Sequence, residues 1–139
     1  SIGRALAFLP DDGGPSRADR LRGTARQWLE AALAPGATPR FAAAHTERPA
    51  GARGAFGETL EFLGLWLRDL AAVAAGADDE VVDVDAVDTL RSLAERVRPE
   101  RIPEAIQRVE EARDAGRINA NPQLTLATLL TDLNASLRR

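Results

Sequence analysis

Few side chains in this sequence could do chemistry, and their spacing matches no catalytic or metal-binding pattern. His45 is the only histidine, it stands two residues before Glu47, and the sequence contains no cysteine. A zinc site or an acid–base pair needs several such groups that converge on one point. We therefore expect His45 to be a partly exposed loop residue with no catalytic or metal-binding role.

The acidic stretch ADDEVVDVDAVD, residues 77–88, is a second candidate, because carboxylate oxygens are ligands that calcium prefers. Its first five carboxylates belong to Asp78, Asp79, Glu80, Asp83 and Asp85. They lack the glycine and the terminal glutamate of an EF-hand loop. We expect a solvated loop instead, with Asp85 as the N-cap of the next helix and Asp88 in its first turn, where the helix dipole favours carboxylates.

Glycine-rich phosphate-binding loops are absent, because the sequence contains neither GxxxxGK[ST] nor GxGxxG. The chain by itself has no visible means of binding and hydrolysing ATP. We therefore expect that it is not an enzyme and that it uses no metal, no cofactor and no small-molecule substrate.

Charge and composition narrow the class of protein further. All 18 basic residues are arginines, 21 residues are acidic, and the two signs are interleaved along the chain, for a net charge of -3. We therefore expect no direct nucleic-acid binding. Cysteine is absent and no apolar run reaches the roughly 18 residues of a membrane span, so we expect a cytoplasmic protein without membrane contact. The chain lacks methionine and opens inside a helical pattern, which suggests a fragment of something longer.

The elements that must position these side chains are helical by pattern. The turn PDDGGP, residues 10–15, separates a helix end at residues 1–9 from the remainder of the chain, and we expect a domain boundary there. No segment alternates β-branched residues with period two, so we predict an all-α domain, a compact bundle of about five helices, over residues 16–139. The helical patterns cover residues 16–34, 41–44, 55–76, 85–97, 99–116 and 122–137.

The segment 55–76 carries two apolar stripes, so we expect helices to cover it on two sides at the centre of the domain. The first stripe is Phe56, Leu60, Leu63, Leu67 and Leu70, and the second is Phe62, Trp66 and Val73. Trp28 and Trp66 both fit apolar stripes, which places them in the core. Arg68 and Asp69 interrupt the pattern, and they mark either the strip where this helix reaches solvent or a surface that binds another subunit.

The last helix begins with explicit signals. Asn121 is a favoured N-cap, Ser16 plays the same part for residues 17–34, and Pro122 is a favoured first helical residue. The leucine stripe that follows is Leu126, Leu130, Leu133 and Leu137. Because each buried leucine contributes roughly 1.5–3 kcal/mol, we expect this helix to be integral to the fold.

Three stretches carry a resemblance to a known family. They are SIGRAL at residues 1–6, TLEFLGLWLRDLAAVAAG at 59–76 and EEARDAGRINANPQLTLATLLTDL at 110–133. In this order they resemble the C-terminal part of bacterial DNA polymerase III clamp-loader subunits, most closely the delta-prime subunit and less closely the gamma/tau type. The resemblance spans nearly the whole chain.

This resemblance implies a fold and a role. Residues 16–139 would be the helical collar, an oligomerisation domain that joins five subunits into the ring that opens the sliding clamp and places it on primed DNA. Residues 1–15 would be the end of the preceding helical lid and a linker, with Arg4 as the second sensor arginine. The other clamp-loader subunits would be the partners, and the parent protein would belong to the clamp-loader ATPase of the polymerase III holoenzyme.

A collar buries apolar surface between neighbours, so some apolar side chains must face other subunits. Leu124 and Leu129 lie off the main stripe of the last helix, and Arg68 lies off that of the central helix, so we predict these three at the subunit interface. The residues alone leave two alternatives open: a helical regulator whose apolar stripes enclose a small-molecule pocket, and a helical enzyme that uses the acidic loop.

Overall fold

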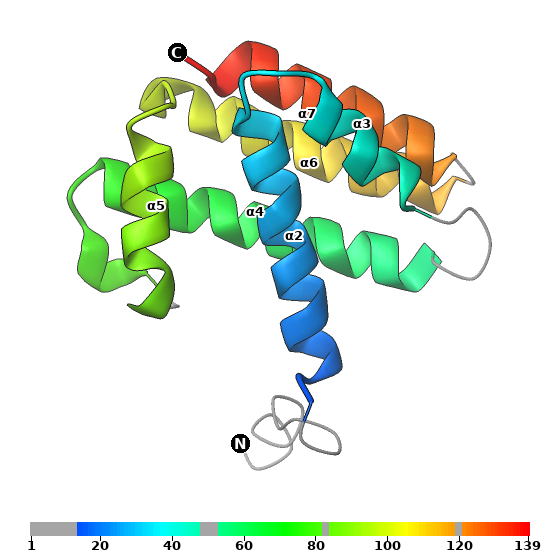
Figure 1. Ribbon diagram of the computed structural model, residues 1–139, viewed down its shortest axis with the longest axis horizontal. Coiled ribbons are helices and arrows are strands. Elements are labelled where there is room, and N and C mark those ends of the chain that lie inside the picture. Colours follow the sequence, from blue (N-terminus) through cyan, green and yellow to red (C-terminus); the bar gives the residue numbers. More distant parts are fainter. Residues whose placement is uncertain (1–13, 48–52, 82–83, 119–120) are drawn as a thin grey trace.

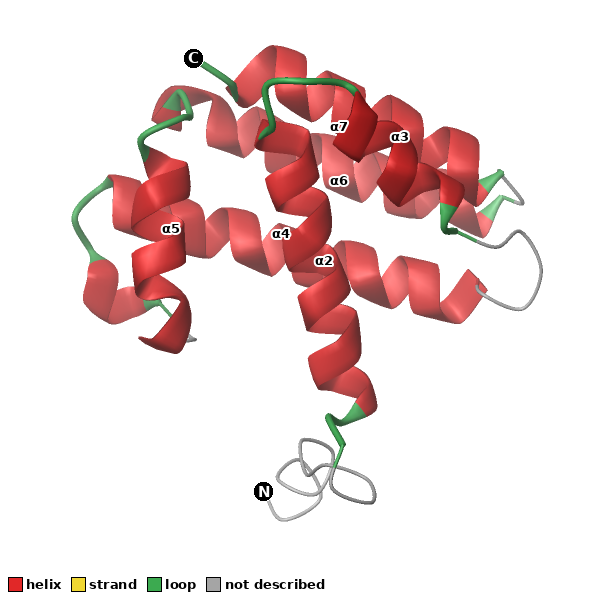
Figure 2. Ribbon diagram, in the orientation of Figure 1, coloured by secondary structure: helices red, strands yellow, loops and turns green. Residues whose placement is uncertain are grey.

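The computed structural model describes residues 14–47, 53–81, 84–118 and 121–139. Within these ranges every regular element is a helix (Figure 2), which confirms the all-α prediction. The α-helices are α2 (Arg17–Leu33), α3 (Thr38–His45), α4 (Arg53–Ala74), α5 (Val87–Ala94), α6 (Ile102–Arg117) and α7 (Pro122–Leu137). Three 3-10 turns join them: η2 (Asp78–Glu80), η3 (Val84–Ala86) and η4 (Pro99–Arg101). None of the described helices is both long enough and apolar enough to span a bilayer.

Helix α4 is the longest and lies at the centre of the bundle, as its two stripes predict (Figure 1). It packs against α6, α2 and α5, while α7 packs against α6, α3 and α2. Helix α2 crosses in front of α4, and α3 lies over α7. The bundle therefore has α4 covered on both of its apolar sides.

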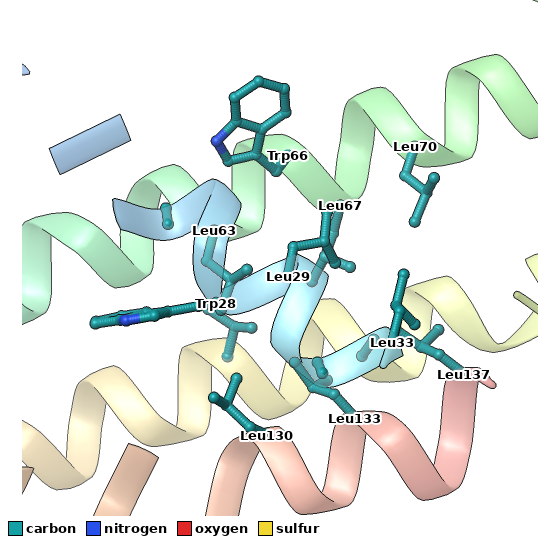
Figure 3. Close-up of a cluster of buried hydrophobic side chains, with 14 of the residues drawn as sticks. Trp28, Leu29, Leu33, Leu63, Trp66, Leu67, Leu70, Leu130, Leu133 and Leu137 are labelled. Atoms are coloured by element: carbon teal, nitrogen blue, oxygen red, sulfur yellow. The ribbon is translucent and has the colours of Figure 1, made fainter. Parts of the chain in front are cut away.

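The core lies where α2, α4 and α7 meet (Figure 3). Its largest fully buried side chains include Trp28, Leu29 and Leu33 from α2 and the leucine stripes of α4 and α7. The predicted first stripe of α4 is wholly buried, and in the second stripe Trp66 and Val73 are buried while Phe62 is half-buried. Burial of this many large apolar groups is the main term that favours the fold.

Both tryptophans belong to the core, as predicted, and each is fixed by a specific contact. The rings of Trp28 and Phe56 are tilted with centroids 5.7 Å apart, a favourable aromatic arrangement. The indole Nε1 of Trp66 donates to the Arg22 carbonyl oxygen at 3.0 Å, and the Arg22 guanidinium lies 4.7 Å from the indole centroid. These contacts lock α2 onto α4.

Three helix ends carry the predicted signals. The Ser16 hydroxyl accepts from the Asp19 amide at 3.1 Å, and the Asn121 side-chain oxygen accepts from the Gln123 amide at 2.9 Å. Gly76 ends α4 with a φ of 80°, and the Ala77 amide donates back to the Ala72 carbonyl at 2.8 Å, as a Schellman motif requires. The local sequence is therefore sufficient to predict these three helix ends.

Two predicted boundaries are wrong. Asp85 is not the N-cap of α5, because the turn η3 contains it and the cap position falls on Ala86. Asp88 does lie in the first turn of α5, as predicted. Helix α6 continues one residue past Gly116, to Arg117, and a Cβ at Gly116 would lie 3.7 Å from the Phe56 ring of α4.

Candidate functional site

The residues singled out for chemistry do not converge. His45 is the last residue of α3 and is exposed, not in a loop as predicted. The carboxylate of Asp78 is bound by the Arg91 guanidinium through Nε at 2.9 Å, and Asp83 lies outside the described residues. No group of acidic or histidine side chains in the described part of the chain is arranged to hold a metal ion.

The surface between α3 and α7 carries a shallow apolar groove of about 740 Å³. Phe41 of α3 and Leu124 of α7 stand on its walls with 60% and 66% of their surface exposed. The other lining residues are Thr38, Ala42, Ala44, His45, Asn121, Gln123 and Ala127. None of these nine residues is an arginine, an aspartate or a glutamate, so the groove offers apolar contact without charge.

The two walls of this groove are held together by the start of α7. The side-chain amide of Gln123 donates to the carbonyl oxygens of His45 at 3.2 Å and Glu47 at 2.7 Å, which caps the C-terminal end of α3. Asn121 caps α7 itself in the same corner. The groove is therefore preformed, because its walls are fixed to each other by hydrogen bonds.

Glu47 lies beside this cap and is half-buried. Burial disfavours a charged carboxylate, and it raises the pKa of Glu47 above its ordinary value. The charge state of the corner therefore depends on pH.

A second hollow, of about 340 Å³, lies on the other side of Leu124, between α6 and α7. Leu124 lines both hollows and forms a ridge between them, which we call the Leu124 ridge. Leu129 lies in the second hollow but is only 4% exposed, because α6 covers this side of α7. Of the predicted interface residues on α7, Leu124 thus presents its side chain to solvent, whereas Leu129 supports the hollow from within.

Arg68 lies elsewhere. It is exposed on α4 and, with the half-exposed Leu65, lines a hollow of about 210 Å³ between α4 and α6. This hollow and the one beside Leu124 use opposite flanks of α6, so the structure does not bring Arg68 together with Leu124. Asp69 is buried, so of the two residues that interrupt the apolar pattern of α4 only Arg68 is exposed.

Phe41 was not recognised as a surface anchor from the sequence. Its helix was predicted as short and partly apolar, but burial depends on whether a neighbour covers it. The signal that could have identified Phe41 is the shortness of its helix, because eight residues present too little surface to the core to bury all of their apolar groups. In the structure only Ala44 of this helix is buried. Arg4, the predicted sensor residue, lies outside the described residues.

The hollows around α7 and α6 are open to solvent along one side. A small-molecule site usually encloses about 70–90% of its ligand, so these surfaces fit an extended partner better than a small ligand. The predicted alternative of an enclosed regulatory pocket finds no support in them.

Comparison with protein families gives a match over most of the chain. The family described as DNA polymerase III, delta subunit, C terminal, matches residues 21–135, which run from the first turns of α2 almost to the end of α7. Comparisons with curated proteins and with solved structures give no match.

Proposed function

Because the chain belongs to the family of C-terminal domains of the DNA polymerase III delta subunit, we propose that it is the collar through which one member of the clamp loader joins the others. Residues 16–139 form this oligomerisation domain in our proposal, and residues 1–15 form the linker and the end of the lid that carries Arg4. The assembled ring loads the sliding clamp onto primed DNA during replication. This chain contributes assembly, and it contributes no catalytic group.

Within the clamp loader, we assign the chain to the delta-prime type. The resemblance of residues 1–6, 59–76 and 110–133 to that subunit supports this assignment, and the family description names a delta subunit. A gamma/tau-type subunit is the alternative.

The observation that carries the proposal is the Leu124 ridge with the apolar hollows on both sides of it. Exposed large apolar side chains that stand next to an apolar groove are typical of protein–protein contacts, where a few such residues anchor the partner. Phe41 and Leu124 supply the anchors, and the α3–α7 groove accommodates one face of an amphipathic helix. The occupant we assign to it is a collar helix of a neighbouring subunit in the clamp loader.

Charged residues lie along one side of this apolar centre, at the hollow between α6 and α7. The hollow between α6 and α7 is rimmed by Arg108, Glu111 and Asp132, whereas its floor contains Ala112 and Leu129. An apolar centre with a polar rim is the usual anatomy of an interface. Leu129 then acts by supporting Leu124 from behind, and Arg68 with Leu65 belongs to a second contact surface on the other flank of α6.

An experiment that measures assembly with the other subunits tests this proposal directly. The chain is mixed with the other purified clamp-loader subunits, and complex formation is followed by analytical size-exclusion chromatography with light scattering. We expect the chain to co-elute with them as a hetero-oligomer. Elution as a separate species at concentrations above about 10 µM, where even modest interfaces associate, would contradict the proposal.

A further inference from the structure

The end of α7 and the segment that precedes η4 are joined by an isolated antiparallel bridge between Val97 and Arg138. The Arg98 amide donates to the Leu137 carbonyl at 2.7 Å, and the Arg139 amide donates to the Arg96 carbonyl at 2.9 Å. Val97 is fully buried beneath the bridge. The bridge thereby collects four arginines on adjacent chain segments, Arg96, Arg98, Arg138 and Arg139, which we call the arginine corner.

This corner concentrates positive charge on a protein that is acidic overall. Residues 95–100 and 137–139 contain these four arginines and two glutamates, Glu95 and Glu100, which gives these nine residues a side-chain charge of +2 against -3 for the whole chain. Interleaved signs along the sequence led us to expect no nucleic-acid surface. Folding changes that expectation, because it brings together two segments about 40 residues apart.

Within the described residues, none of the four corner arginines has a side-chain carboxylate as a partner. The Arg139 Nε donates to the Val97 carbonyl at 2.7 Å and the Arg138 guanidinium to the Pro35 carbonyl at 3.5 Å, and both acceptors are neutral. Arg96 and Arg98 are exposed and have no hydrogen-bond or ion-pair partner for their side chains within the described ranges. Many other arginines do have a carboxylate, as Arg113 has Glu61 and Arg117 has Asp114.

The chemistry of the corner selects the class of ligand. Its side chains include no exposed large apolar group, since those of the described residues are Phe41, Leu65, Val84, Ile118 and Leu124. A protein partner needs such a group at the centre of its contact, whereas a phosphodiester backbone needs only unneutralised guanidinium groups on adjacent chain segments. We infer that the arginine corner binds the phosphate backbone of nucleic acid without reading its sequence, which goes beyond the assembly role proposed above.

Fluorescence anisotropy with a labelled single strand of about 30 nucleotides and a duplex of the same length tests this inference on the whole 139-residue sequence. We expect binding that weakens steeply with salt, and we expect R96A/R98A to lower the affinity by roughly tenfold and to reduce the salt slope by about 1.4–1.8. The matched control is R26A/R117A, which removes the same charge from exposed positions of α2 and α6. The control should change the affinity less than about threefold.

Three results would overturn the inference. One is an absence of binding at about 50 mM salt, and another is an equal loss of affinity in R96A/R98A and R26A/R117A, which would mean non-specific attraction. The third is tighter binding of a poly-glutamate peptide of matched charge than of the oligonucleotides, which would identify an acidic protein as the ligand. Circular dichroism of both variants checks that the helices are intact. Assembly with the other subunits is measured separately, so a failure of one proposal is distinguishable from a failure of the other.

Discussion

The side-chain amide of Asn134 in α7 lies 2.8 Å from the carbonyl oxygen of Ala32 in α2 and donates a hydrogen bond to it. The same amide reaches the Ala34 carbonyl at 3.2 Å. Helix α7 therefore caps the C-terminal end of α2, where the last carbonyls have no partner within their own helix. The local sequence of α2 contains no residue that could do this.

Replacement of Asn134 by alanine should destabilise the fold by about 1–2 kcal/mol, because it leaves partly buried carbonyl oxygens without a donor. Urea unfolding followed by circular dichroism measures the change. The control is Thr131→Ala on an exposed position of the same helix, where the expected change is below about 0.5 kcal/mol. Equal effects of the two substitutions would show that the cap contributes nothing.

Replacement of Leu124 by aspartate should weaken assembly with the other clamp-loader subunits at least about tenfold, because a charge would enter an apolar contact. The stability of the chain alone should change by less than about 0.5 kcal/mol, since the side chain is mostly exposed. Val84→Asp is the matched control, because Val84 is 78% exposed and lines none of the hollows described above. Surface plasmon resonance compares the variants, and an unchanged affinity for Leu124→Asp would exclude the ridge from the interface.

Two glycines, one inside the longest helix and one at its end, should respond to alanine in opposite directions. Gly64 lies in the middle of α4, and an added methyl group would meet open space, so Gly64→Ala should stabilise the fold by about 0.5–1 kcal/mol through helix propensity. Gly76 adopts a left-handed φ of 80°, so Gly76→Ala should destabilise it by roughly 1 kcal/mol. Thermal unfolding of both variants gives the two signs, and a loss of stability in Gly64→Ala would contradict the expected gain.

The burial of Glu47 predicts that the free energy of unfolding depends on pH. Burial raises the pKa of Glu47 in the folded chain above its unfolded value, so the stability associated with its proton is present below the unfolded pKa and is lost as pH rises through the folded pKa. Glu47→Gln removes this loss. The variant should therefore gain stability relative to the parent chain as pH increases from about 4 to 7.

Urea midpoints across this pH range measure the effect. Glu95→Gln serves as the control, because Glu95 is an exposed residue that follows α5. A stability difference between Glu47→Gln and the parent chain that stays constant with pH, or that shrinks toward neutral pH, would contradict the assignment.

Local signals predicted much of this fold. Helices α2, α4 and α7 follow from their apolar periodicity, and the caps at Ser16, Gly76 and Asn121 depend only on residues within one turn. The central place of α4 also follows from sequence, because two apolar stripes require two covering neighbours. These features are local or depend on hydrophobic pattern alone.

Most of the features that the sequence did not predict depend on which other helix packs against an element. Leu129 is buried by α6, Phe41 is left uncovered because nothing in the described chain packs over it, and Asp85 belongs to a 3-10 turn. The gathering of arginines at the Val97–Arg138 bridge likewise requires knowledge of tertiary pairing. For this chain, the elements and the main buried stripes of α4 and α7 were readable from the sequence, but the neighbours that cover or expose their other sides were not.

The position of α7 along the chain has a consequence for biosynthesis. The ribosome makes α7 after the other described helices, yet α7 supplies five buried leucines of the core, some of which Figure 3 shows, and the side chains that complete the ends of α2 and α3. Until α7 has been translated, the leucines of α2 and α4 are not fully buried, and they expose apolar surface on the nascent polypeptide. We therefore expect the core to be complete only once α7 has left the ribosome, and the exposed apolar surface to favour aggregation before that point.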